Sequence, residues 1–191
     1  MSANTGFTYT LCDTTATASE AVEVLRHYRY LALDCEGIDL GTVGGKLSVI
    51  AMAGLSDATR VATDVSIHVF LFDVLTLEPT LLEPAFALLR SPHVTKVVFD
   101  GRMDFSELFH RHGVELIQVL DLQLADVESR RIRGESLEKQ LDRLSSYCQR
   151  REVQSQPRSY HYVHRLNGLA FCASEHGVGG DREKCEYNSK H

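Results

Sequence analysis

The order of the short apolar segments constrains the fold of this chain more than any other feature. Five segments with the composition of β-strands are expected at residues 30–35, 47–53, 67–73, 95–99 and 117–120, after a short strand at 7–12. Segments with helical spacing follow the last three strands, at residues 80–89, 103–112 and 122–131, and Gly113 could end the second of them. A helix that Thr17 or Ser19 could cap is expected before them, up to about His27, and a short apolar helix is expected at 166–174. Successive strands, followed by strands that alternate with helices, predict an α/β fold with a mixed five-stranded sheet flanked by helices.

Length and composition narrow the class of protein. The chain has 191 residues, of which 43% are hydrophobic and 24% charged, as is typical of one soluble globular domain. No apolar run approaches the roughly 20 residues of a membrane-spanning helix, and the first residues lack the basic flank and apolar core of a signal peptide. We therefore expect an intracellular protein, nuclear or cytoplasmic, with one domain at residues 7–175 and a disordered tail at 176–191.

Charge and cysteine content exclude further classes. The net charge of −6 argues against a protein that coats DNA through broad electrostatic attraction, because such proteins are usually basic. An enzyme that holds nucleic acid through a metal site is still compatible with this charge. The five cysteines are scattered and none forms a Cys-x-x-Cys pair, so we expect reduced thiols rather than a zinc site or a disulfide framework.

The segment YLALDCEG, residues 30–37, ends a strand of buried type with two carboxylates, Asp34 and Glu36. Residues i and i+2 of a strand point to the same side of the sheet, so both carboxylates are directed at one place and Cys35 faces the other way. Such a pair raises its own proton affinity unless solvent, a shared proton, a basic neighbour or a divalent cation offsets the repulsion. The pair suits Mg²⁺ or Mn²⁺, and a solvated strand end is the alternative.

The segment KVVFDGRMDF, residues 96–105, places Asp100 and Asp104 around a glycine turn between a strand and a helix. Aspartates favour a helix N-terminus through capping and through the helix dipole, and this explanation suffices for Asp100. A carboxylate in the first helical turn, opposite the strand end that carries Asp34 and Glu36, would also supply a third metal ligand. Asp104 is therefore a candidate ligand.

The order of these motifs resembles the DEDD superfamily of 3′–5′ exonucleases, and more narrowly its ribonuclease D-like branch and the small exonuclease-domain proteins of eukaryotes. The strand with Asp-x-Glu is followed by LSVI at 47–50, KVVFDGRMD at 96–104, LDLQLA at 120–125 and LNGL at 166–169. The resemblance covers about residues 7–175 and implies a ribonuclease H-like fold. In that family the residue at the position of Asp121 is generally structural, as a cap of the next helix.

By this resemblance Asp34, Glu36 and Asp104 are catalytic metal ligands that hold Mg²⁺ or Mn²⁺ in a two-metal site. Two such ions can activate a water molecule and stabilise the leaving 3′-oxygen of a phosphodiester. We expect Asp34 to bridge both ions, Glu36 to complete the shell of one ion and position the water, and Asp104 to hold the other ion. The implied partner is single-stranded nucleic acid, RNA or DNA, which the enzyme hydrolyses from its 3′ end.

The chain departs from the family at the fourth acidic residue. The family carries this acid on a late helix, in a Tyr-x-x-x-Asp or His-x-x-x-x-Asp motif whose first residue orients the water or acts as a base. The stretch from His176 to Asp181 fits by letters only, because Gly177, Gly179 and Gly180 each disfavour a helix by roughly 1 kcal/mol. We therefore expect a C-terminally incomplete fold, with apolar surface exposed on one side of the sheet and little activity.

Three hypotheses stay open at this point. The first is a metal-dependent exonuclease, and the second is a catalytically inactive relative that binds nucleic acid or protein. The third is an unrelated α/β protein whose acids bind one structural cation. The missing fourth acid favours the second hypothesis, and the retained Asp34, Glu36 and Asp104 favour the first.

The segment at residues 128–165 is strongly charged and has little apolar periodicity. Leu137, Leu141 and Leu144 fit one helical face, which predicts a solvated helix and loop. The alternative is a basic finger toward a polyanion, because Arg130, Arg131 and Arg133 lie close together, as do two further arginines at 150 and 151.

Overall fold

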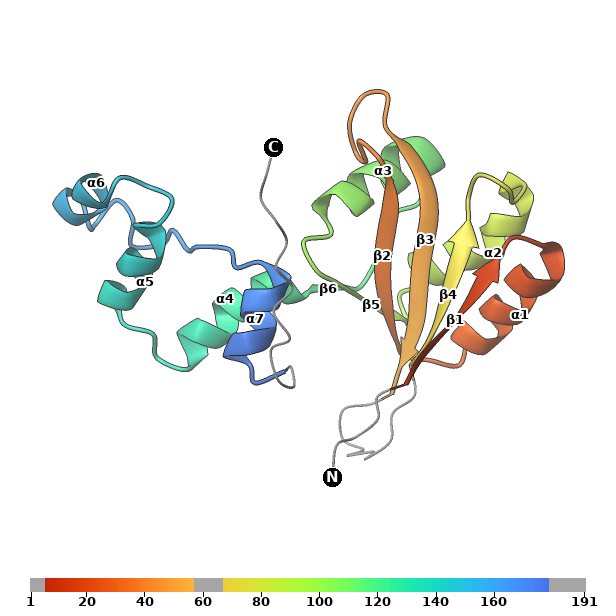
Figure 1. Ribbon diagram of the computed structural model, residues 1–191, viewed down its shortest axis with the longest axis horizontal. Coiled ribbons are helices and arrows are strands. Elements are labelled where there is room, and N and C mark those ends of the chain that lie inside the picture. Colours follow the sequence, from red (N-terminus) through yellow and green to blue (C-terminus); the bar gives the residue numbers. More distant parts are fainter. Residues whose placement is uncertain (1–5, 57–66, 179–191) are drawn as a thin grey trace. The chain divides into compact units, whose positions relative to one another are not determined.

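The computed structural model describes residues 6–56 and 67–178, which fall into two compact units, Met1–Leu122 and Gln123–His191. The first unit contains β1 (Phe7–Cys12), α1 (Thr15–Leu25), β2 (Tyr30–Ile38), β3 (Lys46–Leu55), β4 (Ile67–Asp73), α2 (Pro79–Arg90), β5 (Thr95–Val98), α3 (Arg102–His112) and β6 (Val119–Asp121). The helices α4 (Leu122–Ile132), α5 (Leu137–Leu144), α6 (Arg150–Ser155) and α7 (Leu169–Glu175) follow (Figure 1). Each unit is described by itself, and the expected domain limits of 7–175 stay a prediction.

The first unit is built on one six-stranded sheet with the order β1-β4-β3-β2-β5-β6. The pairs β2–β3 and β3–β4 are antiparallel, whereas β1–β4, β2–β5 and β5–β6 are parallel. The expected mixed sheet with flanking helices is thus confirmed. The expected number of five strands is wrong, because β1 pairs with β4 along all six of its residues and forms the edge of the sheet.

The core of the first unit lies on one face of the sheet. Leu31, Leu33 and Cys35 of β2 alternate with exposed or half-buried residues and are themselves at most 5% exposed. They belong to one buried cluster with the apolar residues of α1 and α2, which Figure 1 shows together beside the sheet. Each fully buried large apolar side chain stabilises the fold by roughly 1.5–3 kcal/mol, so this cluster fixes β2, the strand that carries Asp34 and Glu36.

The other face of the sheet carries apolar side chains that stay accessible. Phe7 and Tyr9 of β1 are 70% and 74% exposed. A shallow groove of about 310 Å³ runs over this face, and its lining includes Ala51, Val69 and the candidate ligand Asp34. This surface fits the expectation of an exposed apolar face on one side of the sheet.

Helices make up the second unit. The helix expected from Leu137, Leu141 and Leu144 is present as α5, and the apolar segment near the C-terminus forms α7. His176 is the C-cap of α7, and residues 179–191, which include Asp181 and most of the expected tail, lie outside the described residues. Within 6–56 and 67–178, no helix is long and apolar enough to cross a membrane.

Candidate metal centre

Asp34 and Glu36 lie near the end of β2 on the face opposite the core, and both are exposed. Cys35, between them, is buried. Its burial, with the nearby charges of Asp104 and Asp34, raises the pKa of the Cys35 thiol far above its ordinary value. Cys35 therefore stays protonated and serves as a core residue, and the alternation expected for this strand is present.

The chain bends directly after Glu36. The pairing of β2 with β3 shifts register between Glu36 and Gly37, which is the mark of a β-bulge. A Cβ atom on Gly37 would lie 2.1 Å from the carbonyl oxygen of Lys46, so only glycine fits there without movement of the backbone. The bulge therefore interrupts the pairing directly after the two carboxylates, and the pairing resumes in a shifted register at Gly37 and Ile38.

Asp121 holds the turn between β5 and α3. Its Oδ1 accepts a hydrogen bond from the N–H of Asp100 at 3.2 Å, and its Oδ2 accepts one from the N–H of Gly101 at 3.3 Å. Asp100, at φ +56°, forms two hydrogen bonds with the Arg102 guanidinium, which lower the pKa of Asp100. Asp121 therefore has a structural role in supporting this turn.

Neither aspartate of this turn caps α3. The N-cap is Gly101, and no side chain accepts a capping hydrogen bond there. Asp104 instead lies in the first turn of α3 and is only 8% exposed. The capping explanation for Asp100 and Asp104 is therefore wrong, although the negative charge of Asp104 still suits the helix dipole.

The strongest electrostatic feature of the site is the protonation of Asp104. Burial, followed by the charges of Asp34, Glu36 and Asp100, raises the pKa of Asp104 to about 7. The structure thus brings the three predicted ligands within range of each other's charge. Among the described residues, however, no group of three or more His, Cys, Asp or Glu side chains is assembled closely enough to hold a metal ion as it stands.

The chemistry of these residues fits a divalent cation. Their donors are carboxylate oxygens, which are the preferred ligands of Mg²⁺ and Mn²⁺. A cation at this place would favour the charged form of Asp104, whose ionisation its buried and acidic surroundings oppose. Asp34, Glu36 and Asp104 are therefore the residues that could hold a metal.

The loop between β2 and β3 is held against α3 by Glu107, a residue that the sequence did not single out. Glu107 is 1% exposed, and its Oε2 accepts a hydrogen bond from the N–H of Gly41 at 2.9 Å. Ser106 donates to the Gly41 carbonyl at 3.1 Å, and Arg111 donates to the Thr42 carbonyl at 3.3 Å. Gly41 has φ +70° and approaches the backbone of α3, so a side chain there would be strained.

Glu107 lies one helical turn after Asp104. This spacing is the only feature of the sequence that could have indicated a role for Glu107. Three residues along a helix return to nearly the same face. Its other oxygen, Oε1, lies 3.3 Å from Arg111 Nε, and the ion pair is buried on the glutamate side. Glu107 therefore connects the helix that carries Asp104 to the loop that follows Glu36.

Replacing Glu107 with alanine is expected to destabilise the first unit by about 2 kcal/mol, because the Gly41 N–H loses its acceptor and the Arg111 guanidinium loses its ion pair. Urea unfolding measures this change, and hydrogen exchange should become faster at the Gly41 amide. The exposed Glu115 provides the matched control, since Glu115→Ala removes the same side chain without a buried partner. Equal stability of the two variants would contradict this role of Glu107.

The first unit is thus an α/β domain with a mixed sheet, carboxylates near the end of β2 and an acidic residue in the first turn of α3. The family model described as 3′-5′ exonuclease matches residues 9–156. The chain therefore belongs to the 3′–5′ exonuclease family, and the resemblance to the DEDD exonucleases is confirmed. No curated protein matches the chain in sequence.

Solved structures support the same fold. The Trypanosoma brucei RNase D, determined in complex with the RNA U12, is 27% identical with a TM-score of 0.52, over 92% of this chain and 59% of that chain. The Aedes aegypti Nibbler EXO domain is 20% identical with a TM-score of 0.52, over 66% of this chain and 58% of that one. Escherichia coli RNase D is 24% identical with a TM-score of 0.50, over 72% of this chain and 33% of that one.

The chain thus spans less than two thirds of the length of each of these structures. The two similarities below 25% identity concern the fold alone. They agree with a ribonuclease H-like architecture, as the mixed sheet and its flanking helices indicate.

Proposed function

We propose that this chain is a metal-dependent 3′–5′ exonuclease domain that hydrolyses phosphodiester bonds at the 3′ end of single-stranded nucleic acid. Its catalytic metal ligands would be Asp34, Glu36 and Asp104. The observation that carries the proposal is the acidic surroundings of the buried Asp104. Burial and the charges of Asp34 and Glu36 raise the pKa of Asp104 to about 7. Membership of the 3′–5′ exonuclease family supports it, and so does the similar Trypanosoma brucei RNase D, which was solved with RNA.

Each acidic residue has a distinct task in this proposal. Divalent cations bound there would activate a water molecule and stabilise the charge on the leaving 3′-oxygen. Asp34, on the accessible face of the sheet, would serve as the shared ligand. Glu36 would orient the water by accepting its hydrogen bond. Asp104 would lose its proton when it becomes a ligand, and Glu107 and Asp121 would keep the surrounding loop and turn in position.

An inactive relative that binds nucleic acid or protein is the second candidate. It is favoured by the absence of an assembled three-residue metal cluster among residues 6–56 and 67–178. His176, the first residue of the late stretch that matches the family's fourth motif by letters, lies 3.1 Å from Asp126 Oδ1 within the second unit. The two candidates share the fold and differ in whether a bound strand is shortened.

The test is a titration of Mg²⁺ or Mn²⁺ with single-stranded RNA and DNA that carry a label at the 5′ end. We expect slow, stepwise shortening from the 3′ end that requires the metal and stops in EDTA. A substrate with phosphorothioate linkages at its 3′ end is the control and should be shortened more slowly. Binding without shortening would favour the inactive relative, and neither binding nor shortening would reject both candidates.

A further inference from the structure

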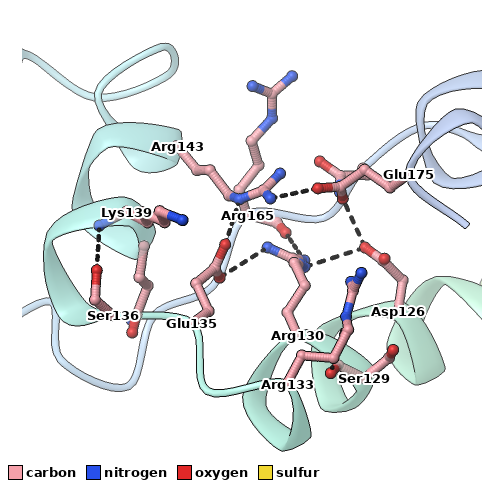
Figure 2. Close-up of polar contacts among 12 residues, drawn as sticks. Asp126, Ser129, Arg130, Arg133, Glu135, Ser136, Lys139, Arg143, Arg165 and Glu175 are labelled. Carbon is pink, nitrogen blue, oxygen red and sulfur yellow. Dashed lines mark hydrogen bonds and ion pairs between the residues drawn. The ribbon is translucent and has the colours of Figure 1, made fainter.

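The second unit contains a small pocket at the turn between α4 and α5, shown in part in Figure 2. Its volume is about 260 Å³, below the roughly 300–1,000 Å³ that is typical of sites for drug-sized ligands. Four cationic side chains line it together with two carboxylates. These are Arg130, Arg133, Lys139 and Arg143, against Glu135 and Glu175.

The two inner arginines are fixed by ion pairs. Arg143 binds Glu135 through Nε at 2.6 Å and also contacts Glu175, and Figure 2 shows both interactions. Arg130 is 2% exposed and lies 3.2 Å from Asp126 and 3.7 Å from Glu135. Its Nη2 donates to the Arg165 carbonyl at 2.7 Å. This network holds both guanidinium groups in place at the wall of the pocket.

Arg130, which lines the pocket, is held partly by charge. Its buried Nε and Nη1 lie 3.2 Å from Asp126 and 3.7 Å from Glu135, and among the described residues neither forms a hydrogen bond of good geometry. At the rim, neither Arg133 nor Lys139 forms an ion pair with any residue in the described part of the chain.

We propose that this pocket binds one phosphate group, and that in the complete reaction this is a backbone phosphate of the single-stranded substrate. The second part of the proposal rests on the proposed exonuclease function. Phosphate matches the site because guanidinium groups bind its oxygens through two parallel hydrogen bonds, and because lysine adds a mobile positive charge. The pocket thereby gives a phosphate-binding role to part of the charged segment at residues 128–165. Such a local site is compatible with the net charge of −6 of the whole chain.

Other arginines of the same segment are engaged differently and provide matched controls. Arg131 is paired with Glu128 at 2.6 Å, and Arg150 lies 3.7 Å from Asp142. Both arginines are exposed and neither lines the pocket. The double variant Arg131→Gln/Arg150→Gln therefore removes the same charge as Arg133→Gln/Lys139→Gln, but leaves the pocket intact.

The experiment compares these two double variants with the full wild-type chain in EDTA, so that hydrolysis does not take part. One arm measures the affinity for a fluorescein-labelled oligouridylate by anisotropy at several salt concentrations. The other arm measures binding of inorganic phosphate by calorimetry. We expect Arg133→Gln/Lys139→Gln to weaken oligouridylate binding about tenfold. The slope of log affinity against log salt should decrease in magnitude by about 0.7, as for one lost phosphate contact.

The outcomes separate this proposal from the exonuclease function. If the two double variants lost affinity for oligouridylate equally, or if neither lost affinity, the pocket would not be a phosphate-binding site. Loss of phosphate binding with unchanged oligouridylate affinity would identify a site for free phosphate and overturn the role in substrate binding. Pocket-dependent binding by a chain that does not shorten RNA or DNA would support the pocket and reject the proposed exonuclease function.

Discussion

Replacing Asp34 with asparagine is expected to reduce metal-dependent shortening of a 5′-labelled strand at least about a hundredfold, to background. Asparagine has nearly the same shape but lacks the negative charge that a shared metal ligand supplies. Because Asp34 is exposed near the end of β2 and outside the buried core, the variant should still fold and show a cooperative urea unfolding transition. The measurement is the initial rate of shortening at saturating Mn²⁺, with urea unfolding run in parallel.

Asp39 provides the matched control for this variant. It is an exposed carboxylate in the loop that follows β2, and its φ of +48° is one that asparagine also adopts readily. Asp39→Asn should keep its rate within about twofold of the wild-type rate, since surface changes away from a site have small effects. Asp34 would not be a metal ligand if both variants lost activity equally, or if Asp34→Asn kept most of the wild-type rate.

In the absence of metal, the stability of the first unit is expected to fall as the pH rises from about 4 to about 7. The pKa of Asp104 in the folded chain is about 7, whereas that of an unfolded aspartate is about 3.9. Between these values the folded chain binds more protons than the unfolded chain, so the free energy of unfolding decreases with increasing pH. Asp104→Asn removes this titration and should stabilise the chain at about pH 8 by about 2–4 kcal/mol.

Urea unfolding in EDTA at low and high pH tests this prediction. Asp39→Asn again serves as the control, and its unfolding should depend on pH as that of the wild-type chain does. A wild-type chain whose stability is the same at about pH 5 and about pH 8 would contradict a buried, electrostatically opposed Asp104. So would an Asp104→Asn variant that is less stable than the wild-type chain at the higher pH.

Several elements could be predicted because their signals are local. The period of two along β2 placed Asp34 and Glu36 opposite the buried Leu33 and Cys35, as observed. The helix expected at residues 103–112 is α3, and it ends at Gly113 as expected for a glycine with positive φ. In each case the pattern lies within about ten residues, so no distant contact was needed to interpret it.

Other features depend on partners far away in the sequence. β1 was expected only as a short strand, and its place in the sheet comes from pairing with β4, some sixty residues later. The role of Asp121 depends on the backbone of Asp100 and Gly101. Lys96, within an apolar strand, is fully buried because its ammonium donates to the carbonyls of two loop residues, Ser91 and Val94.

One local prediction also failed. The first helix was expected to be capped by one of the polar residues near position 17 or 19, but its N-cap is Thr14. Thr17 is the N3 residue, and its hydroxyl accepts from the Thr14 N–H, which completes a capping box with threonine in place of the usual Glu or Gln. Several Ser and Thr residues near the start of the helix are equally good N-cap candidates by residue type. Only the backbone geometry decides which of them is the N-cap.

The most direct measurement is calorimetric titration of the chain with Mn²⁺ at about pH 6.5, in buffers with different ionisation enthalpies. We expect saturable binding that releases protons, because Asp104 must lose its proton to become a ligand, and we expect Asp34→Asn and Asp104→Asn each to abolish this binding. The absence of saturable binding in the wild-type chain, or binding that both variants retain, would contradict a metal centre at Asp34, Glu36 and Asp104.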